Sequence, residues 1–118
     1  MIITDAIRPA GATIGLSVTA SSHAAATLQA GEPSANGRFL VNPSTTVVVY
    51  VNVATSTNGG AAPSAAAATI PGDGTAGSIP ILPYQKIILA GLQYPVSITA
   101  IGSAAGPTLI TATPVQMI

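Results

Sequence analysis

The sequence predicts an all-β domain, an antiparallel β-sandwich or small barrel of about eight short strands. Valine and isoleucine number 22 against seven leucines, and β-branched side chains suit the pleat of a sheet. Twelve glycines and ten prolines interrupt the chain, which argues against long helices and for many turns. Short alternating segments between such turns, at a spacing of about 8–12 residues, are typical of a sandwich.

The chain length indicates one structural unit. Its 118 residues suffice for a hydrophobic core without disulfides or metal, and no cysteine is present. We assign residues 1–11 to an N-terminal arm, which is extended or forms an edge strand. Residues 12–118 form a single β-sandwich domain.

Alternation of apolar and polar residues locates the strands of the first half. The clearest is 45–55, where four valines line one face, and Asn42-Pro43-Ser44 stops the strand before it. The alanine-rich stretch 61–68 has no apolar stripe and is too short for a stable isolated helix, so we expect a loop or at most one helical turn. The strands expected in this half cover residues 12–20, 24–28, 38–41 and 45–55.

Prolines and loops divide the second half. Residues 79–83 are extended, because residues that precede a proline avoid helix. The strands expected after it cover 84–89, 94–101 and 108–113. The last two make the best hairpin candidate, and Pro114 is expected to limit the last strand or to place it at an edge.

Charge is scarce, and this excludes several function classes. Three basic residues spread along the chain form no patch that would neutralise phosphates, so no nucleic acid is expected as partner. The densest apolar stretch, 87–92, is far shorter than the roughly 18 residues of a membrane-spanning helix, and the N-terminus has no basic region of a signal peptide. The charged residues are Asp5, Arg8, Glu32, Arg38, Asp73 and Lys86.

The few ionisable side chains do not form a recognisable catalytic motif. His23 is the one candidate base, and no nucleophile elbow of the Gly-x-Ser-x-Gly kind accompanies it. Glu32 and Asp73 lie in separate loops, where Asp73 between two glycines fits a turn cap. Calcium needs several carboxylates in one loop and zinc needs Cys or several His. We predict no enzyme, no cofactor and no metal site.

Arg38 and Phe39 begin a strand, and two interpretations of Arg38 remain open. It is either an inward or rim arginine paired to Glu32 or to a carbonyl, or an anchor in a protein–protein contact, where Arg and aromatic residues are favoured. The three tyrosines, Tyr50, Tyr84 and Tyr94, lie on separate strands and form no stacking platform. The candidate interface residues are Ile2, Ile3, Ile7, Arg8, Arg38 and Phe39.

The surface of the folded chain is also expected to carry few charged side chains. A folded chain of this mass exposes on the order of 5,800 Å², and soluble domains usually carry about a quarter to a third of their surface residues as charges. Alanine, glycine, serine and threonine make up 58 residues and give small, neutral side chains that allow close packing. We hypothesise that much of this surface is covered in an assembly.

Several segments follow one another in a characteristic order: SVTASS at 17–22, RFLVNPS at 38–44, the β-branched strand 47–53, SIPILP at 78–83 and VSITAIGSAAGPTLIT at 96–111. In this order the chain resembles small virion proteins of tailed bacteriophages. The resemblance covers roughly residues 15–113 and rests on small residues rather than on catalytic ones.

This resemblance implies a jelly-roll-like β-sandwich that decorates and cements a capsid by binding major capsid subunits. It further implies a symmetric homo-oligomer, with a trimer favoured, located on the capsid surface after synthesis in the host cytoplasm. The alternative is a head-fibre or tail accessory subunit that binds a receptor or glycan, which requires aromatic and polar groups clustered in one set of loops.

Overall fold

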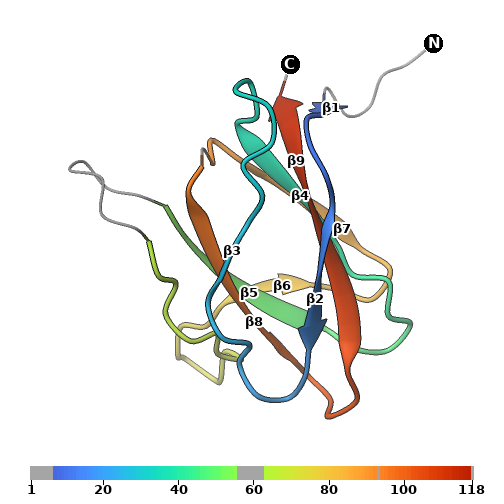
Figure 1. Cartoon of the computed structure of the whole chain (residues 1–118). Coiled ribbons are helices and arrows are strands. Elements are labelled where there is room, and N and C mark those ends of the chain that lie inside the picture. Colours follow the sequence, from blue (N-terminus) through green and yellow to red (C-terminus); the bar gives the residue numbers. More distant parts are fainter. Residues whose placement is uncertain (1–6, 56–62, 93, 118) are drawn as a thin grey trace.

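The computed structural model describes residues 7–55, 63–92 and 94–117, which form two packed antiparallel sheets (Figure 1). In chain order the strands are β1 (Ile7–Pro9), β2 (Ile14–Val18), β3 (Ala26–Thr27), β4 (Gly37–Val41), β5 (Val49–Thr55), β6 (Ile79–Ile81), β7 (Lys86–Ala90), β8 (Val96–Gly102) and β9 (Thr108–Met117). Sheet A has the order β1-β9-β4-β7, with β2 also paired to β9, and sheet B has the order β3-β8-β5-β6.

The strand pairing is that of a jelly roll. Four antiparallel pairs are nested in the sequence: β5 with β6, β4 with β7, β3 with β8, and β2 with β9. A long hairpin rolled up so that its pairs alternate between two sheets gives this order, as in double-sheet jelly rolls. The all-β antiparallel sandwich expected from the sequence is therefore confirmed, with β1 as one strand more than the eight expected.

The core lies between the sheets, where alternate residues of the central strands meet. Leu40 of β4 and Ile110 of β9 face Val51 of β5 and Ile98 of β8, and all four side chains are fully buried. Core-facing and outward-facing residues alternate along each strand, because successive side chains point to opposite faces of the sheet. The other fully buried apolar side chains of this cluster are Val18, Leu28, Val49, Ile81, Val96 and Ala100.

The expected hairpin between 94–101 and 108–113 is wrong. The strand β8 belongs to sheet B, between β3 and β5, and β9 belongs to sheet A, between β2 and β4. Both are central strands with buried inner faces, so each needs neighbours on both sides. Their connection, residues 103–107, is long enough to cross the roughly 10 Å that separates packed sheets.

Pro114 neither ends the last strand nor places it at an edge, contrary to expectation. The strand β9 continues to Met117 between two neighbours. Pro114 lies where the partner of β9 changes, because β2 pairs as far as Ala112 and β1 begins opposite Val115. The carbonyl of Pro114 accepts a hydrogen bond from the Ala10 N–H at 2.9 Å, and no strand partner stands where the missing N–H would donate.

One strand boundary differs from the expectation, whereas the alanine-rich loop agrees with it. The strand expected at 45–55 begins only at Val49, because the Ser44 hydroxyl accepts a hydrogen bond from the Val47 N–H at 2.9 Å and holds a turn there. The described part of the alanine-rich stretch, from Pro63 onward, forms a loop without helix, as expected. Residues 7–9 match the edge-strand alternative for the arm.

Asn42 ties the two sheets together at the end of β4. Its side chain is fully buried, and its Nδ2 donates hydrogen bonds to the carbonyls of Val47 at 2.8 Å and Ile81 at 2.9 Å. Its Oδ1 accepts one from the Ser44 N–H at 3.1 Å. A buried amide with its donors and its acceptor engaged fixes loop geometry without an unsatisfied polar group.

Candidate functional site

Part of the outer face of sheet B, around Ser97 and Thr99 of β8, is covered by the chain itself. The segment 63–70 lies over β8, where the Ala65 N–H donates to the Ser97 hydroxyl at 3.0 Å and the Thr99 hydroxyl donates to the Ala66 carbonyl at 2.6 Å. Both hydroxyl residues are buried as a result, at 2% and 3% exposure. This cover supplies partners for polar groups that would otherwise face solvent on the outside of sheet B.

The outer face of sheet A keeps its side chains half-buried or exposed. They alternate with residues that pack in the core, and therefore point away from it. Their register forms rows across the sheet, for example Thr113, Phe39 and Ile88. We call this set the outer face of sheet A: Ser17, Phe39, Val41, Lys86, Ile88, Leu109, Thr111 and Thr113.

This outer face combines apolar side chains with threonine hydroxyls. Leu109 is 58% exposed and lies over Gly15, where an added Cβ would come within 2.9 Å of its Cδ1. The hydroxyls of Thr13 and Thr113 lie 2.6 Å apart in a hydrogen bond. A surface of this kind is inexpensive to desolvate, because it holds few charges and its hydroxyls both donate and accept.

Lys86 brings positive charge to this set, and its Nζ lies over the Phe39 ring, 5.9 Å from the centroid. This distance is within reach of a cation–π attraction, which contributes about 0.5–1 kcal/mol at exposed sites. Phe39 was expected at an interface, and it does lie on the outer face of sheet A.

Arg38, the neighbour of Phe39, points the opposite way. It shares the inner face of β4 with Leu40 and is 0% exposed, so a partner cannot reach it without opening the sandwich. Its Nη1 donates to the carbonyls of Gly37 at 2.9 Å and Leu92 at 3.0 Å. The guanidinium thus bonds to carbonyls and not to Glu32.

The remaining guanidinium edge of Arg38 has no hydrogen-bond partner among the described residues. Both Nε and Nη2 are buried without one. Burial lowers the pKa of Arg38 below its ordinary value because desolvation penalises the charged form. A buried cation that has no carboxylate partner among residues 7–55, 63–92 and 94–117 destabilises the fold.

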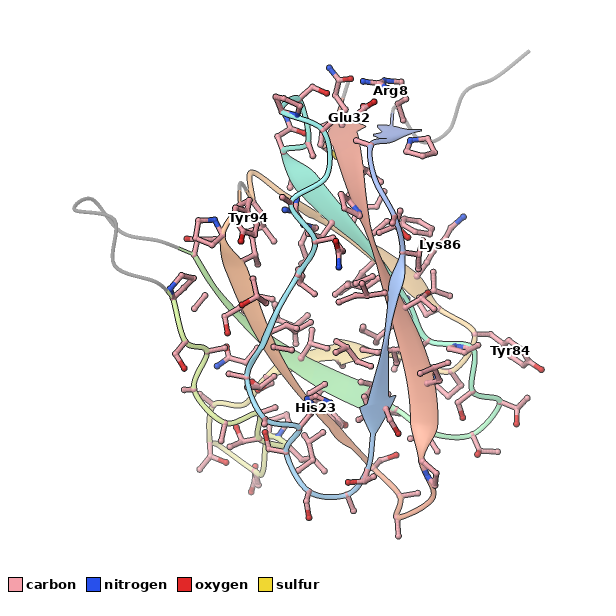
Figure 2. All side chains as sticks on the ribbon, viewed as in Figure 1. Arg8, His23, Glu32, Tyr84, Lys86 and Tyr94 are labelled. Atoms are coloured by element: carbon pink, nitrogen blue, oxygen red, sulfur yellow. The ribbon has the colours of Figure 1, made fainter. Side chains whose placement is uncertain are left out.

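A polar cluster lies at the end of the sandwich where β1 pairs with β9 (Figure 2). Arg8 and Glu32 form an ion pair at 3.1 Å, and both side chains are about half exposed. The Nε of Arg8 donates to Gln116 Oε1 at 2.9 Å, and its Nη2 donates to the Ser34 hydroxyl at 3.2 Å. Arg8 thus has several partners of its own chain, and the Glu32 partner expected for Arg38 belongs to it instead.

A hollow of about 290 Å³ lies beside this cluster. Its walls include Glu32, Pro33 and Tyr94, and the tyrosine is 56% exposed. The hollow lies between the loop before β4 and the connection from β7 to β8. An exposed aromatic ring beside a carboxylate and an arginine is an arrangement that suits the face and hydroxyls of a sugar.

The remaining predicted residues do not assemble a catalytic or metal centre in the part described. His23 is hydrogen-bonded through Nδ1 to the Ala24 carbonyl at 2.7 Å and lies far from Arg8 and Glu32 in Figure 2. Asp73 is exposed in a turn. Over residues 7–55, 63–92 and 94–117, no three His, Asp or Glu side chains gather where they could hold one metal ion.

Other parts of the expected interface cannot be placed. Ile2 and Ile3 lie outside the described residues, as does the side chain of Ile7, whose backbone belongs to β1. The described segments contain no helix that is long and apolar enough to cross a membrane. Comparison with protein-family models, curated proteins and solved structures finds no match to this chain.

Sequence reasoning missed two features of these surfaces. The Arg8–Glu32 cluster joins residues 24 positions apart, and only the pairing of β1 with the end of β9 brings them together. The difference between the two outer faces depends on where the alanine-rich loop folds. The sequence carries no signal for this cover, because Ser97 and Thr99 alternate with apolar residues as they would in any strand with a solvent-facing side.

Proposed function

We propose that this chain is a structural virion protein that decorates and cements a bacteriophage capsid by binding major capsid subunits through the outer face of sheet A. The observation that carries the proposal is the contrast between the two sheets. In sheet B the hydroxyls of Ser97 and Thr99 are covered by residues 63–70, whereas sheet A presents half-buried and exposed Phe, Ile, Leu and Thr side chains.

The chemistry of this face suits a permanent contact. Interface cores are depleted in charge and enriched in aromatic side chains, and Phe39 lies among Val41, Ile88 and Thr113 on adjacent strands. Threonine hydroxyls satisfy backbone groups of a partner without the desolvation penalty of an ion. The resemblance to small phage virion proteins agrees with this role, as does the jelly roll, a fold found in viral capsid domains.

The proposed working state is a symmetric homo-oligomer, with a trimer favoured, on the capsid surface. The partners are the major capsid protein and further copies of the chain. The role requires neither catalysis nor a cofactor, and it needs no nucleic acid or membrane contact. Adhesion is the function, and the sparse charge of the chain keeps the repulsion between neighbouring copies low.

The proposal is tested on particles. Mature heads of the phage that encodes the chain should contain it at a fixed ratio to the major capsid protein, measured by quantitative mass spectrometry after removal of tails. Heads lacking the chain should break at lower temperature or lower ionic strength, and adding the purified chain should restore them. Finding the chain only in tails, or only in the soluble fraction of infected cells, would contradict the proposal.

A second candidate is a head-fibre or tail accessory subunit that binds a receptor glycan. The hollow beside Tyr94 favours it, because Glu32 and the neighbouring Arg8 supply polar groups next to an exposed ring. A glycan array with the purified chain tests this candidate. Binding that Tyr94→Ala abolishes supports it, while an array without any hit counts against it.

A further inference from the structure

The turn between β6 and β7 holds Tyr84 in a backbone conformation that is uncommon for a bulky residue. Its φ is +59°, in the left-handed region, whereas every other described residue with a positive φ is a glycine. The Gln85 N–H donates to the Leu82 carbonyl at 3.0 Å, which closes a β-turn with Pro83 and Tyr84 at its centre. Proline followed by a positive φ is the pattern of a type II turn, whose second central position favours glycine or asparagine.

Hydrogen bonds from several sides hold this strained turn. The Leu82 N–H donates to Oε1 of Gln85 at 3.0 Å. The Tyr84 N–H donates to the Ser44 carbonyl at 3.0 Å. The buried Asn42 holds both ends, because its Nδ2 donates to the Leu82 carbonyl at 3.3 Å and its N–H to the Gln85 carbonyl at 2.9 Å. Strained backbone persists where the surrounding structure over-determines it, so the direction of the tyrosine is set before any partner binds.

The Tyr84 side chain finds little support within its own chain. It is 75% exposed, more than any other large apolar side chain in the described segments. Its hydroxyl makes no hydrogen bond to another residue of 7–55, 63–92 or 94–117. Figure 2 shows the ring projecting outward from the sandwich, on the side of Lys86 and away from Tyr94. Packing inside the molecule therefore does not explain why a tyrosine occupies a position suited to glycine.

The surroundings of the ring are apolar. Leu82 is 50% exposed and Pro83 is half-buried. Gln85 is the polar side chain of the turn, and its Oε1 already accepts the Leu82 N–H. A glycan brings many hydroxyls whose desolvation requires hydrogen-bonding partners, and this turn supplies few. A tyrosine beside a leucine suits an apolar pocket on a protein surface instead.

The turn adjoins the outer face of sheet A. It leads directly into β7, whose Lys86 and Ile88 belong to that face. The Ser44 carbonyl that accepts the Tyr84 N–H follows Asn42 at the end of β4, the neighbouring strand of the same sheet. A protein that covers the outer face of sheet A therefore meets the Tyr84 ring at one end of its contact.

We propose that Tyr84 is the anchor of the capsid contact, and that its ring enters an apolar pocket on the major capsid subunit bound by the outer face of sheet A. This inference rests on the proposed cementing function and names the residue that carries much of its affinity. Tyrosine is favoured at such anchor positions, since it offers a large contact area with few rotatable bonds. The rigid turn lowers the entropy lost on binding further, because the ring is already directed outward.

The strained turn gives the proposal a signature that ordinary surface residues lack. Tyr84 costs the isolated chain stability, because glycine or asparagine would fit the left-handed backbone better. In the complex the ring contributes contacts that neither of these residues can make. Stability of the free chain and affinity for the partner therefore place opposite demands on this position, as at other strained functional sites.

Two variants test this opposition. Tyr84→Gly and Tyr84→Asn should each raise the melting temperature of the purified chain by roughly 2–4 °C, measured by circular dichroism. Both should bind capsids that lack the chain at least about 30-fold more weakly than wild type in co-sedimentation, the loss expected for a hot-spot residue. The two substitutions should agree, which separates the relief of strain from the flexibility that glycine adds to the unfolded chain.

Two further variants show that the ring and its position matter. Tyr84→Phe keeps the ring and should stay within a few-fold of wild-type affinity, because the pocket is apolar. Ile70→Ala removes an apolar side chain of 47% exposure from the loop between β5 and β6 and should bind like wild type.

The outcomes separate the anchor from the cementing function. Wild-type chain that does not bind the capsids contradicts both. Wild-type binding with equal affinity of Tyr84→Gly and Tyr84→Asn overturns the anchor alone and leaves the cementing function standing. A lower melting temperature in both variants would mean that the ring supports its own fold and overturns the proposal. A glycan-array signal that Tyr84→Gly loses would assign the ring to a sugar and overturn it as well.

Discussion

Replacing Arg38 with methionine should stabilise this protein, although it removes two hydrogen bonds and a positive charge. The guanidinium is 0% exposed, and its Nη1 donates to two carbonyls, whereas Nε and Nη2 have no partner among the described residues. Each lost hydrogen bond costs about 1 kcal/mol net, and each buried unsatisfied donor costs about 1–3 kcal/mol. Methionine has a similar length and no polar hydrogen to bury.

The balance favours Arg38→Met by about 1–2 kcal/mol in the free energy of unfolding, in line with buried ions replaced by apolar residues elsewhere. Urea denaturation followed by circular dichroism measures it, with Arg8→Met as the matched control. Arg8 lies in an exposed ion pair, and such pairs contribute about 0–1 kcal/mol. A loss of more than about 2 kcal/mol in Arg38→Met would refute the reasoning, because it would mean that the guanidinium edge has a partner.

Two further changes test the packing of the loops. Asn42→Ala should lower the free energy of unfolding by about 2–4 kcal/mol, since it leaves the carbonyls of Val47 and Ile81 without this donor, and an unchanged midpoint in urea would contradict this. Gly31→Ala should cost more than Gly74→Ala, although φ is +72° at both positions. A Cβ at Gly31 would lie 2.4 Å from the Ala10 carbonyl oxygen, whereas one at Gly74 meets nothing within 4 Å, so equal losses in thermal unfolding would contradict the contact.

The alternation of apolar and polar residues predicted most strands, because each sheet turns one face toward the core and the other away from it. The valines before Thr55 and the residues from Thr108 onward mark β5 and β9, whose inner residues are buried as expected. The same alternation places Arg38, two residues before Leu40 on one strand, on the face of Leu40 inside the sandwich. Composition pointed the other way, since arginine is rarely buried unpaired, and this kept both interpretations of Arg38 open.

Features that depend on the strand order were not accessible from the sequence. The hairpin expected before Pro114 failed because β8 and β9 belong to different sheets, and only the whole topology decides this. Arg8 meets Glu32 only because β1 joins the end of β9. The sequence analysis already gave Phe39, which lies on the outer face of sheet A, as a candidate interface residue. The cover over Ser97 is visible only once the position of the alanine-rich loop in the fold is known.

The most direct test of the central claim measures adhesion through the outer face of sheet A. Thr111 lies in the middle of this face, between Gly15 and Val41, and Thr69 is an exposed threonine in the segment that covers sheet B. Capsids that lack the chain are mixed with wild-type protein, Thr111→Glu or Thr69→Glu, and co-sedimentation gives the dissociation constants.

A buried unpaired carboxylate costs several kcal/mol, so Thr111→Glu should bind at least about 30-fold more weakly, the equivalent of about 2 kcal/mol. Thr69→Glu should bind like wild type, and both variants should keep the wild-type circular dichroism spectrum. Equal binding of all three proteins, or weaker binding of Thr69→Glu alone, would contradict the assignment of this face as the adhesive surface.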